Sequence, residues 1–250
     1  MKLKYITCSD PRNYNSHDEM FDLWNIDPRV EIAVQMHPGK VSPDTDRYNW
    51  VKQLVDKLQN HQFLYRNWNF AIHINCDWCD DVCNGKIPDA LKPLFRARHE
   101  STGKHVVGRI QLNLPQKTAD NFNPHKLKPV IDFYNNQDFI IQYNDRTKNA
   151  VDALHKTGAK FNLLFDASGG RGKLPSAWQS PVYPIFHQQG YSGGLNPENI
   201  SENLDKISNV AGVFPIWTDA EGGLKTNDKF DVMRAKQYIQ NALRWDEKHR

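Results

Sequence analysis

Glycines gather in three clusters in the last third of the chain, and each cluster follows a short β-rich run. Between a strand and a helix, glycine N–H groups can approach an anion closely, and the helix N-terminus favours negative charge. A single pair would be better explained by a tight turn, but three successive clusters predict a pocket for a phosphorylated ligand. The clusters are Gly169, Gly170 and Gly172, then Gly193 and Gly194, then Gly222 and Gly223.

Two common nucleotide-binding patterns do not account for these glycines. Gly169-Gly170-Arg171-Gly172 lacks the G-x-G-x-x-G spacing of dinucleotide sites, and the chain has no Walker A motif. The sequence therefore favours a mononucleotide or sugar-phosphate ligand, without a bound redox cofactor.

Cysteines are concentrated in one short segment. Cys76, Cys79 and Cys83 fall within eight residues, and His73 stands nearby, so three thiolates and an imidazole could form a zinc or iron–sulfur site. No second cysteine pair completes a standard metal motif, and aspartates are interleaved with the cysteines. We expect free, reduced thiols and no metal.

Eight β-rich runs alternate with segments of helical periodicity along the whole chain, which is the pattern of parallel strands joined by right-handed crossovers. In about 250 residues the eightfold version closes into a barrel, so we predict a single (β/α)8 domain over residues 1–250. A doubly wound open sheet is the alternative, because the fifth and seventh runs are weakly marked. The expected strands are 3–8, 30–36, 70–75, 105–112, 138–143, 161–166, 190–192 and 213–218.

One helix start is well specified by its residues. In Asn196-Pro197-Glu198-Asn199 a capping amide precedes a proline and an acid, which predicts a helix that begins at Asn196 and runs to Ile207.

In a barrel the loops after the strands lie on the face that carries active sites. The glycine clusters are expected on that face.

Charge and hydropathy exclude several functional classes. The net charge of +3, from 32 Lys and Arg against 29 Asp and Glu, is too small for a dedicated nucleic-acid-binding protein. No run approaches the roughly 20 apolar residues of a membrane helix, and the first residues lack a signal-peptide pattern. A cytoplasmic location is expected, while the oligomeric state is not predicted.

Three motifs in the last third resemble, in order and spacing, the final strand–loop segments of the phosphoribosylanthranilate isomerase family. They are Phe165-Asp166-Ala167-Ser168-Gly169-Gly170-Arg171-Gly172-Lys173, Ser192-Gly193-Gly194-Leu195-Asn196-Pro197-Glu198-Asn199-Ile200 and Thr218-Asp219-Ala220-Glu221-Gly222-Gly223-Leu224. Weaker similarity extends to Lys4-Tyr5-Ile6-Thr7-Cys8-Ser9, Ile74-Asn75 and Ile110-Gln111-Leu112. The resemblance is that of a divergent member.

The resemblance implies a TIM barrel that catalyses an Amadori rearrangement in tryptophan biosynthesis without metal or cofactor. Such chemistry needs a general acid to protonate the furanose oxygen and a general base to take the proton from C2 of the sugar. By position, Asp166 matches the acid and Cys8 the base. The implied phosphate-binding residues are Gly193, Gly194, Asn196, Gly222 and Gly223, and the other expected substrate contacts are Lys40, Gln111, Gly169, Gly170 and Asp219.

Two departures from the family pattern bear on the substrate. Where the family has an arginine that holds the anthranilate carboxylate, this chain offers Lys40 or His37, and lysine lacks the bidentate fork that fits a carboxylate. Glu221 stands where the family has serines, and a carboxylate there would repel phosphate if it pointed into the site.

These departures leave three functional interpretations. The first is an isomerase of the phosphoribosylanthranilate isomerase type, and the second is a barrel that binds a phosphorylated ligand or a protein without catalysis. The third is an aldolase or epimerase that acts on another sugar phosphate, although no Schiff-base lysine stands out at a strand end. Fold alone does not choose among them.

Overall fold

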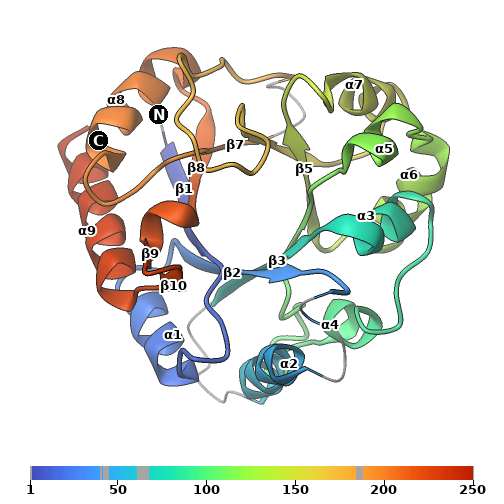
Figure 1. Ribbon diagram of the computed structural model, residues 1–250, viewed down its shortest axis with the longest axis horizontal. Helices are drawn as coiled ribbons and strands as arrows, with labels where there is room; N and C mark the ends of the chain where they lie inside the picture. The colour runs from blue at the N-terminus through green and yellow to red at the C-terminus, as the bar shows by residue number, and fades with distance from the viewer. Residues whose placement is uncertain (1, 40, 42–44, 61–67, 184–187, 250) are drawn as a thin grey trace.

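The chain forms a closed barrel of eight parallel strands in the order β1 to β8, with helices around it (Figure 1). This computed structural model describes residues 2–39, 41, 45–60, 68–183 and 188–249. The barrel predicted from the alternation of strands and helices is confirmed, and the open-sheet alternative is wrong. The strands are β1 (Lys2–Ser9), β2 (Val30–Met36), β3 (Asn69–Ile74), β4 (Arg109–Leu112), β5 (Asp138–Tyr143), β6 (Asn162–Phe165), β7 (Gln189–Ser192) and β8 (Pro215–Ala220).

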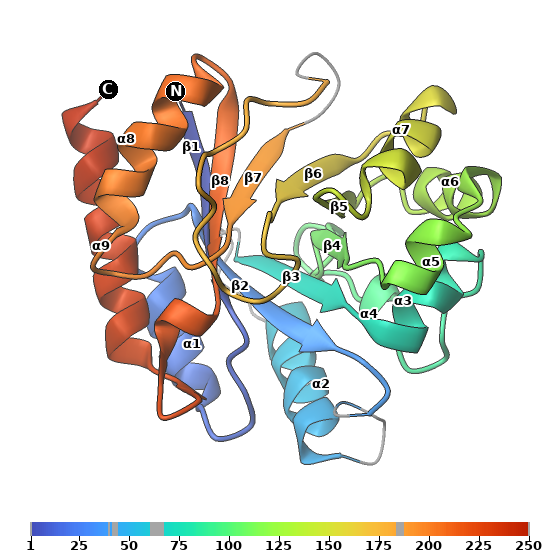
Figure 2. The same ribbon diagram turned by 45° about the horizontal axis from the view of Figure 1, so that its top comes forward.

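Helices cover the outside of the barrel, and α9 closes the ring beside α8 and α1 (Figures 1 and 2). They are α1 (His17–Trp24), α2 (Asp46–Gln59), α3 (Cys76–Cys83), α4 (Lys92–Arg96), α5 (Gln116–Asp120), α6 (Pro124–Phe133), α7 (Lys148–Lys156), α8 (Ile200–Ala211) and α9 (Val232–Lys248). After β8 come the 3-10 turn η1 (Gly222–Leu224) and a small hairpin of β9 (Lys225–Thr226) and β10 (Lys229–Phe230). None of the described helices is long and apolar enough to cross a membrane.

The predicted helix start at Asn196 is wrong by about one turn. Helix α8 begins at Ile200 with Asn199 as its N-cap. Asn196 and Asn199 instead close a turn, because the side-chain oxygen of each accepts a hydrogen bond from the other's backbone N–H at 2.9 Å. The amide and the proline that favour a helix start serve this turn just before it.

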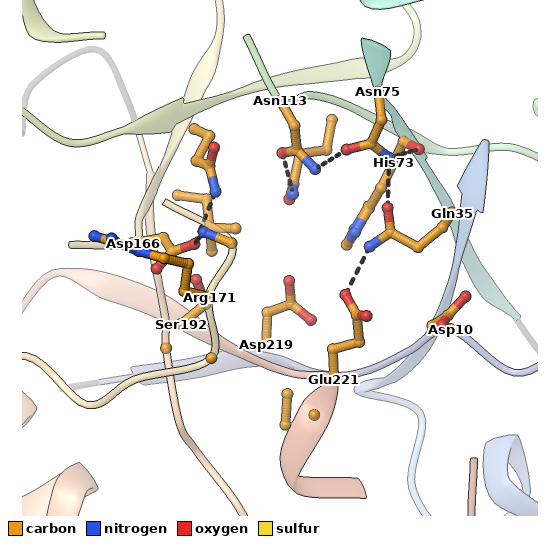
Figure 3. Close-up of a pocket in the computed structure, with 18 of the residues that line it drawn as sticks. Asp10, Gln35, His73, Asn75, Asn113, Asp166, Arg171, Ser192, Asp219 and Glu221 are labelled. Atoms are coloured by element: carbon orange, nitrogen blue, oxygen red, sulfur yellow. Dashed lines mark hydrogen bonds between the residues drawn. The ribbon is translucent and has the colours of Figure 1, made fainter. Parts of the chain in front are cut away.

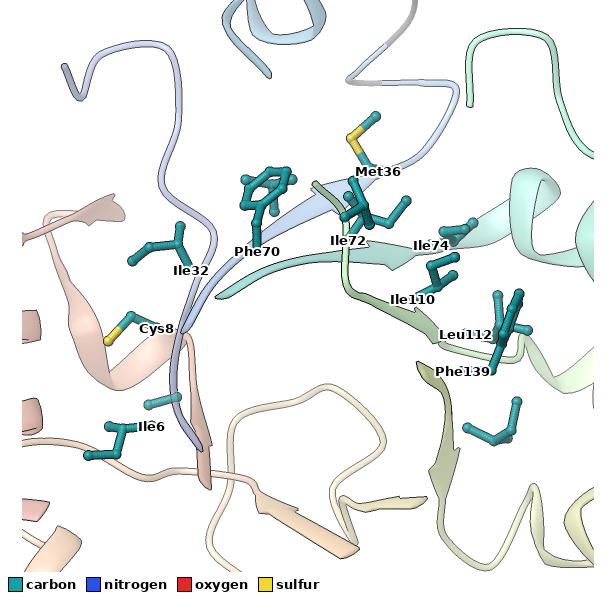
Figure 4. Packing of buried hydrophobic residues seen from close by; sticks show 14 of the residues in the cluster. Ile6, Cys8, Ile32, Met36, Phe70, Ile72, Ile74, Ile110, Leu112 and Phe139 are labelled. Carbon is teal, nitrogen blue, oxygen red and sulfur yellow. The ribbon is translucent and has the colours of Figure 1, made fainter. Parts of the chain in front are cut away.

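Alternation along the strands decides which side chains face the barrel interior and which face the helices. Ile6, Ile32 and Phe70 point outward into the main apolar cluster between strands and helices (Figure 4). Tyr5, Ile140, Leu164 and Trp217 form a separate apolar group that fills the inside of the barrel.

An ion pair lies in the same interior, at the level of Tyr5 and Trp217. Arg109 of β4 donates to Glu31 of β2 at 2.7 Å, and both side chains are almost fully buried. The Arg109 guanidinium also lies over the rings of Tyr5 and Trp217, about 4 Å from each ring centre. The barrel floor is thereby a packed layer, which leaves the opposite end for a pocket.

Gly190 in β7 makes room for the Trp217 indole, because a methyl group at this position would overlap the ring. We expect Gly190→Ala to lower the free energy of unfolding by about 1–3 kcal/mol, through overpacking of the interior. Urea denaturation measures this, with Gly108→Ala as the control, since a Cβ at Gly108 meets no atom within 4 Å. Equal midpoints for the two variants would contradict the packing described here.

Candidate active site

A pocket of about 470 Å³ opens at the carboxyl ends of the barrel strands. Charged and amide side chains from seven of the strands or from the loops that follow them point into it, as Figure 3 shows for several. Its polar lining comprises Asp10, Arg12, Gln35, His37, Arg47, His73, Asn75, Gln111, Asn113, Gln142, Asp166, Arg171, Ser192, Asp219 and Glu221. This is the face on which the barrel fold carries active sites.

Asp219 stands near the end of β8 and is buried at the pocket wall. Burial raises its pKa from 3.8 to about 7, and the charge of the neighbouring Glu221 acts in the same direction. Ser9 of β1 opposes the shift, because its hydroxyl donates a hydrogen bond of 2.5 Å to the Asp219 carboxylate. At neutral pH the carboxyl is therefore present in both protonated and ionised forms.

Asp166 directly follows β6 and has a different hydrogen-bonding environment. Four donors reach its carboxyl: the Gln142 amide at 2.8 Å, the Ser168 N–H at 3.0 Å, the Ser168 hydroxyl at 2.7 Å and the Gly170 N–H at 2.6 Å. Both oxygens accept, which is the pattern of an acceptor-only carboxylate. The loop after β6 thus holds this group in a fixed orientation at the pocket.

On the other side of the pocket, three cationic side chains donate hydrogen bonds to a third carboxylate, Asp10. Arg12 donates to it at 2.7 Å, Lys225 at 2.9 Å, and Arg47 of α2 also donates to it. Burial alone would raise the pKa of Asp10, but the hydrogen bonds and charges of these three cations hold it below its ordinary value. The charges of Arg12, Arg47 and Lys225 are therefore largely compensated within the protein.

The glycine loops expected to bind phosphate reach the pocket in part. Gly193, Gly194 and Gly222 line it, whereas Asn196 and Gly223 do not. Gly193 and Gly194 also have a packing role: an added Cβ would lie 2.8 Å from the Lys173 carbonyl oxygen and 2.6 Å from the Leu174 nitrogen. The long connection after β6 therefore crosses directly over this turn.

Of the remaining predicted substrate contacts, some line the pocket and others do not. Gln111, Gly170 and Asp219 line the pocket. Gly169 does not line it, and its carbonyl accepts a hydrogen bond from Arg146 at 3.1 Å. Lys40 lies outside the described residues.

Cys8, the expected general base, does not face the pocket. It is fully buried in the apolar cluster between the strands and the helices, beside Ile6 and Ile32 in Figure 4. Burial raises the pKa of its thiol far above the ordinary value, so a thiolate is disfavoured there. The expectation that Cys8 reaches the substrate is wrong, because its neighbour Ser9 occupies the inward position of the strand.

The sequence analysis did not single out Asp10, Gln35 or Arg47, and it considered His73 only as a metal ligand. A signal for Gln35 and His73 exists, because each is a polar residue between apolar neighbours near the end of its strand. Arg47 has no such signal, because it reaches the pocket from the first turn of α2.

The cysteine segment forms α3. Cys76, at the first position of this helix, is exposed and borders the pocket, whereas Cys79 and Cys83 are buried. Among the described residues, no group of three or more His, Cys, Asp or Glu side chains is arranged to hold a metal ion.

Sequence comparison finds relatives over part of the chain, although no family model matches it. A protein of Wickerhamomyces anomalus named N-(5'-phosphoribosyl)anthranilate isomerase is 28% identical over 132 residues, which are 51% of this chain and 50% of that protein. Proteins of the same name from Oceanobacillus iheyensis and Saccharomyces kudriavzevii are 27% and 35% identical over 146 and 91 residues. These two matches cover 56% and 33% of this chain, and 65% and 37% of the relatives. The chain thus spans less than two thirds of the length of each.

Structural comparison extends over almost the whole chain. A citrate lyase from Burkholderia xenovorans superposes with a TM-score of 0.50 at 12% identity, covering 100% of this chain and 94% of that one. A phosphoribosyl anthranilate isomerase from Thermococcus kodakaraensis gives a TM-score of 0.49 at 15% identity, with coverage of 96% and 98%.

The fold and the pocket define a (β/α)8 barrel with buried carboxyls at the carboxyl ends of its strands. Within this class the resemblance seen in the motifs is confirmed. Over part of its length the chain is similar to proteins named phosphoribosylanthranilate isomerase, at 27–35% identity.

Because the pKa of Asp219 is raised in the folded protein, the free energy of unfolding should depend on pH. Between pH 4 and 7 the folded protein binds a proton that the unfolded chain has lost, so the stability contribution of Asp219 falls as pH rises. From pH 5 to pH 8, we expect the wild type to lose on the order of 2 kcal/mol relative to Asp219→Asn. Urea denaturation of both proteins at the two pH values measures this, and a difference that does not change with pH would contradict the shifted pKa.

Proposed function

We propose that the protein is an aldose–ketose isomerase that performs an Amadori rearrangement on a phosphoribosylamine. The observation that carries this proposal is a pair of carboxyls, Asp166 after β6 and Asp219 on β8, which face one pocket in different environments. Two carboxyls held in unlike environments can divide acid and base roles at one pH. The names of the curated relatives support the same reaction class.

Asp219 is the general acid of this proposal. Its pKa of about 7 means that a substantial fraction of the carboxyl is protonated at neutral pH, and a proton donor works best when its pKa lies near the working pH. The acid protonates the ring oxygen of the sugar, the C1–O bond breaks, and the nitrogen lone pair forms a C=N bond to C1.

Asp166 is the general base. Its acceptor-only hydrogen bonding suits a group that receives the C2 proton. The electrons of the C–H bond then form a C1=C2 double bond, and the π electrons of the C=N bond return to nitrogen. Protonation of C1 and loss of the C2 hydroxyl proton then complete the aminoketose. Protons move but no electrons leave the substrate, so the reaction is balanced without a redox partner.

The assignment differs from the roles implied by sequence. There Asp166 matched the acid and Cys8 the base, but Cys8 faces away from the pocket while Asp219 faces into it. The hydrogen bonds favour Asp166 as the base and the raised pKa favours Asp219 as the acid.

The phosphate end of the substrate is assigned to the loops after β6, β7 and β8. Gly193, Gly194 and Gly222 line this part of the pocket together with Arg171. Arg171 Nε donates to the Ser168 carbonyl at 2.7 Å, which anchors the guanidinium beside the glycine loops. A cation and closely approachable backbone groups are the elements of a phosphate site.

Removing either carboxyl should abolish most of the activity. We expect Asp166→Asn and Asp219→Asn each to lower kcat by about 10²- to 10⁴-fold, the usual contribution of a general acid or base. Turnover of phosphoribosylamines made from anthranilate and from 2-aminobenzamide is followed by the change in their fluorescence. Phosphate-competitive binding of both compounds without turnover by the wild type would contradict the isomerase and favour a non-catalytic binding protein.

The pH profile tests the assignment of Asp219. Because the acid must be protonated, kcat/KM should fall tenfold per pH unit above about pH 7. Ser9→Ala removes the donor that favours the ionised carboxyl, so we expect this decline to begin about one pH unit higher. Ser201→Ala, an exposed serine of α8, is the control, and an unchanged profile in Ser9→Ala would contradict the role of Asp219.

A further inference from the structure

A continuous row of side-chain amides forms the pocket wall after β2, β3 and β4 (Figure 3). Gln111 donates to Asn113 at 2.9 Å, Asn113 to Asn75 at 2.8 Å, and Asn75 to Gln35 at 2.5 Å. Gln35 then donates to Glu221 at 2.8 Å. We call Gln35, Asn75, Gln111 and Asn113 the amide row.

Glu221 fixes the direction of every hydrogen bond in this row. An ionised carboxylate only accepts, so Gln35 must present its NH₂ group to Glu221 and its oxygen to Asn75. Asn75 therefore accepts from Asn113 through its side-chain oxygen, and Asn113 accepts from Gln111 in the same way. Lys225 donates to the other carboxylate oxygen of Glu221 at 2.9 Å, so both Glu221 oxygens accept hydrogen bonds.

The amide row keeps hydrogen-bonding capacity for a ligand. Each amide has two N–H donors and two acceptor positions, and the bonds along the row use only part of them. His73, paired in register with Gln35 and Gln111, also points into the pocket, and no hydrogen bond to its ring is found in the described part of the chain. Burial, together with the charge of Arg109, lowers the pKa of His73 to about 3, so the ring is neutral and can both donate and accept.

This wall is poorly suited to a carboxylate. The nearby cations Arg12, Arg47 and Lys225 are paired with Asp10 or Glu221. A carboxylate only accepts hydrogen bonds, so it would leave the free acceptor positions of the amide row without partners, which costs binding energy.

We propose that the amide row and His73 bind a neutral substituent that both donates and accepts hydrogen bonds, of which a carboxamide is the simplest planar example. This inference rests on the proposed function and specifies its substrate: a phosphoribosylamine whose amine carries a carboxamide-like group in place of a carboxylate. Glu221 acts as a positioning residue, because it sets the direction in which the row presents donors and acceptors.

The test compares two nearly isosteric substrates, the phosphoribosyl derivatives of 2-aminobenzamide and of anthranilate, which differ in carboxamide against carboxylate. We expect kcat/KM to be at least about tenfold higher for the carboxamide, the factor that corresponds to one unmatched buried polar group. Equal values, or a preference for anthranilate, would overturn this inference while leaving the isomerase proposal intact. Failure of both substrates to react, with both bound, would instead contradict the proposed function.

A substitution within the amide row tests whether these side chains cause the preference for the carboxamide substrate. Asn113→Leu is close in volume and interrupts the row between Gln111 and Asn75, so the ratio of kcat/KM for the carboxamide to that for anthranilate should fall about tenfold. Asn149→Leu, at an exposed position of α7, is the matched control. Thermal unfolding verifies that both variants fold, and calorimetric binding of 2-aminobenzamide and anthranilate gives the same comparison without turnover. An unchanged substrate ratio in folded Asn113→Leu would overturn the role of the row.

Discussion

Closure of the barrel between β1 and β8 is the constraint on which the candidate site depends. The register pairs Thr7 with Asp219 and Cys8 with Ala220, so residues more than 200 positions apart become neighbours. Parallel pairing also fixes which side chains of each strand face inward. Ser9 and Asp219 therefore meet inside the barrel and form a hydrogen bond, whereas Cys8 is directed into the outer apolar layer.

The distribution of charge follows from this geometry. Arg109, the cation deepest in the barrel, is paired with Glu31 below the pocket, and Arg12, Arg47 and Lys225 converge on Asp10. Asp219 is left with a hydroxyl as its partner and with a neighbouring carboxylate. A buried carboxyl without a nearby compensating cation resists ionisation, which is the property a general acid needs at neutral pH.

More of the fold than of the candidate site could be predicted from the sequence. Strand–helix alternation predicted all eight barrel strands, and 30–36 and 138–143 were placed with their observed limits, because buried parallel strands are short apolar runs between turn residues. Inward and outward positions are harder to assign when both faces of a strand are buried. A shift by one residue exchanges the faces, so matching Cys8 to a family motif did not reveal that Ser9 is the inward residue at the end of β1.

Contacts between distant loops are even harder to predict from local sequence patterns. The apposition of Lys173 and Leu174 with the Gly193–Gly194 turn depends on the path of a long connection that contains no helix among its described residues. Arg47 likewise reaches the pocket from a helix, and the amide row requires side chains from three strands or their loops to align. Such arrangements follow from barrel closure, which local periodicity does not specify.

Burial is expected to keep Asp219 partly protonated at neutral pH, and titration of this carboxyl measures that property itself. Carbon-13 NMR of the carboxyl groups, with the Asp219 signal assigned by its loss in Asp219→Asn, reports that titration in the folded protein. We expect a midpoint near pH 7. A midpoint near 4, the value of a solvent-exposed aspartate, would contradict it.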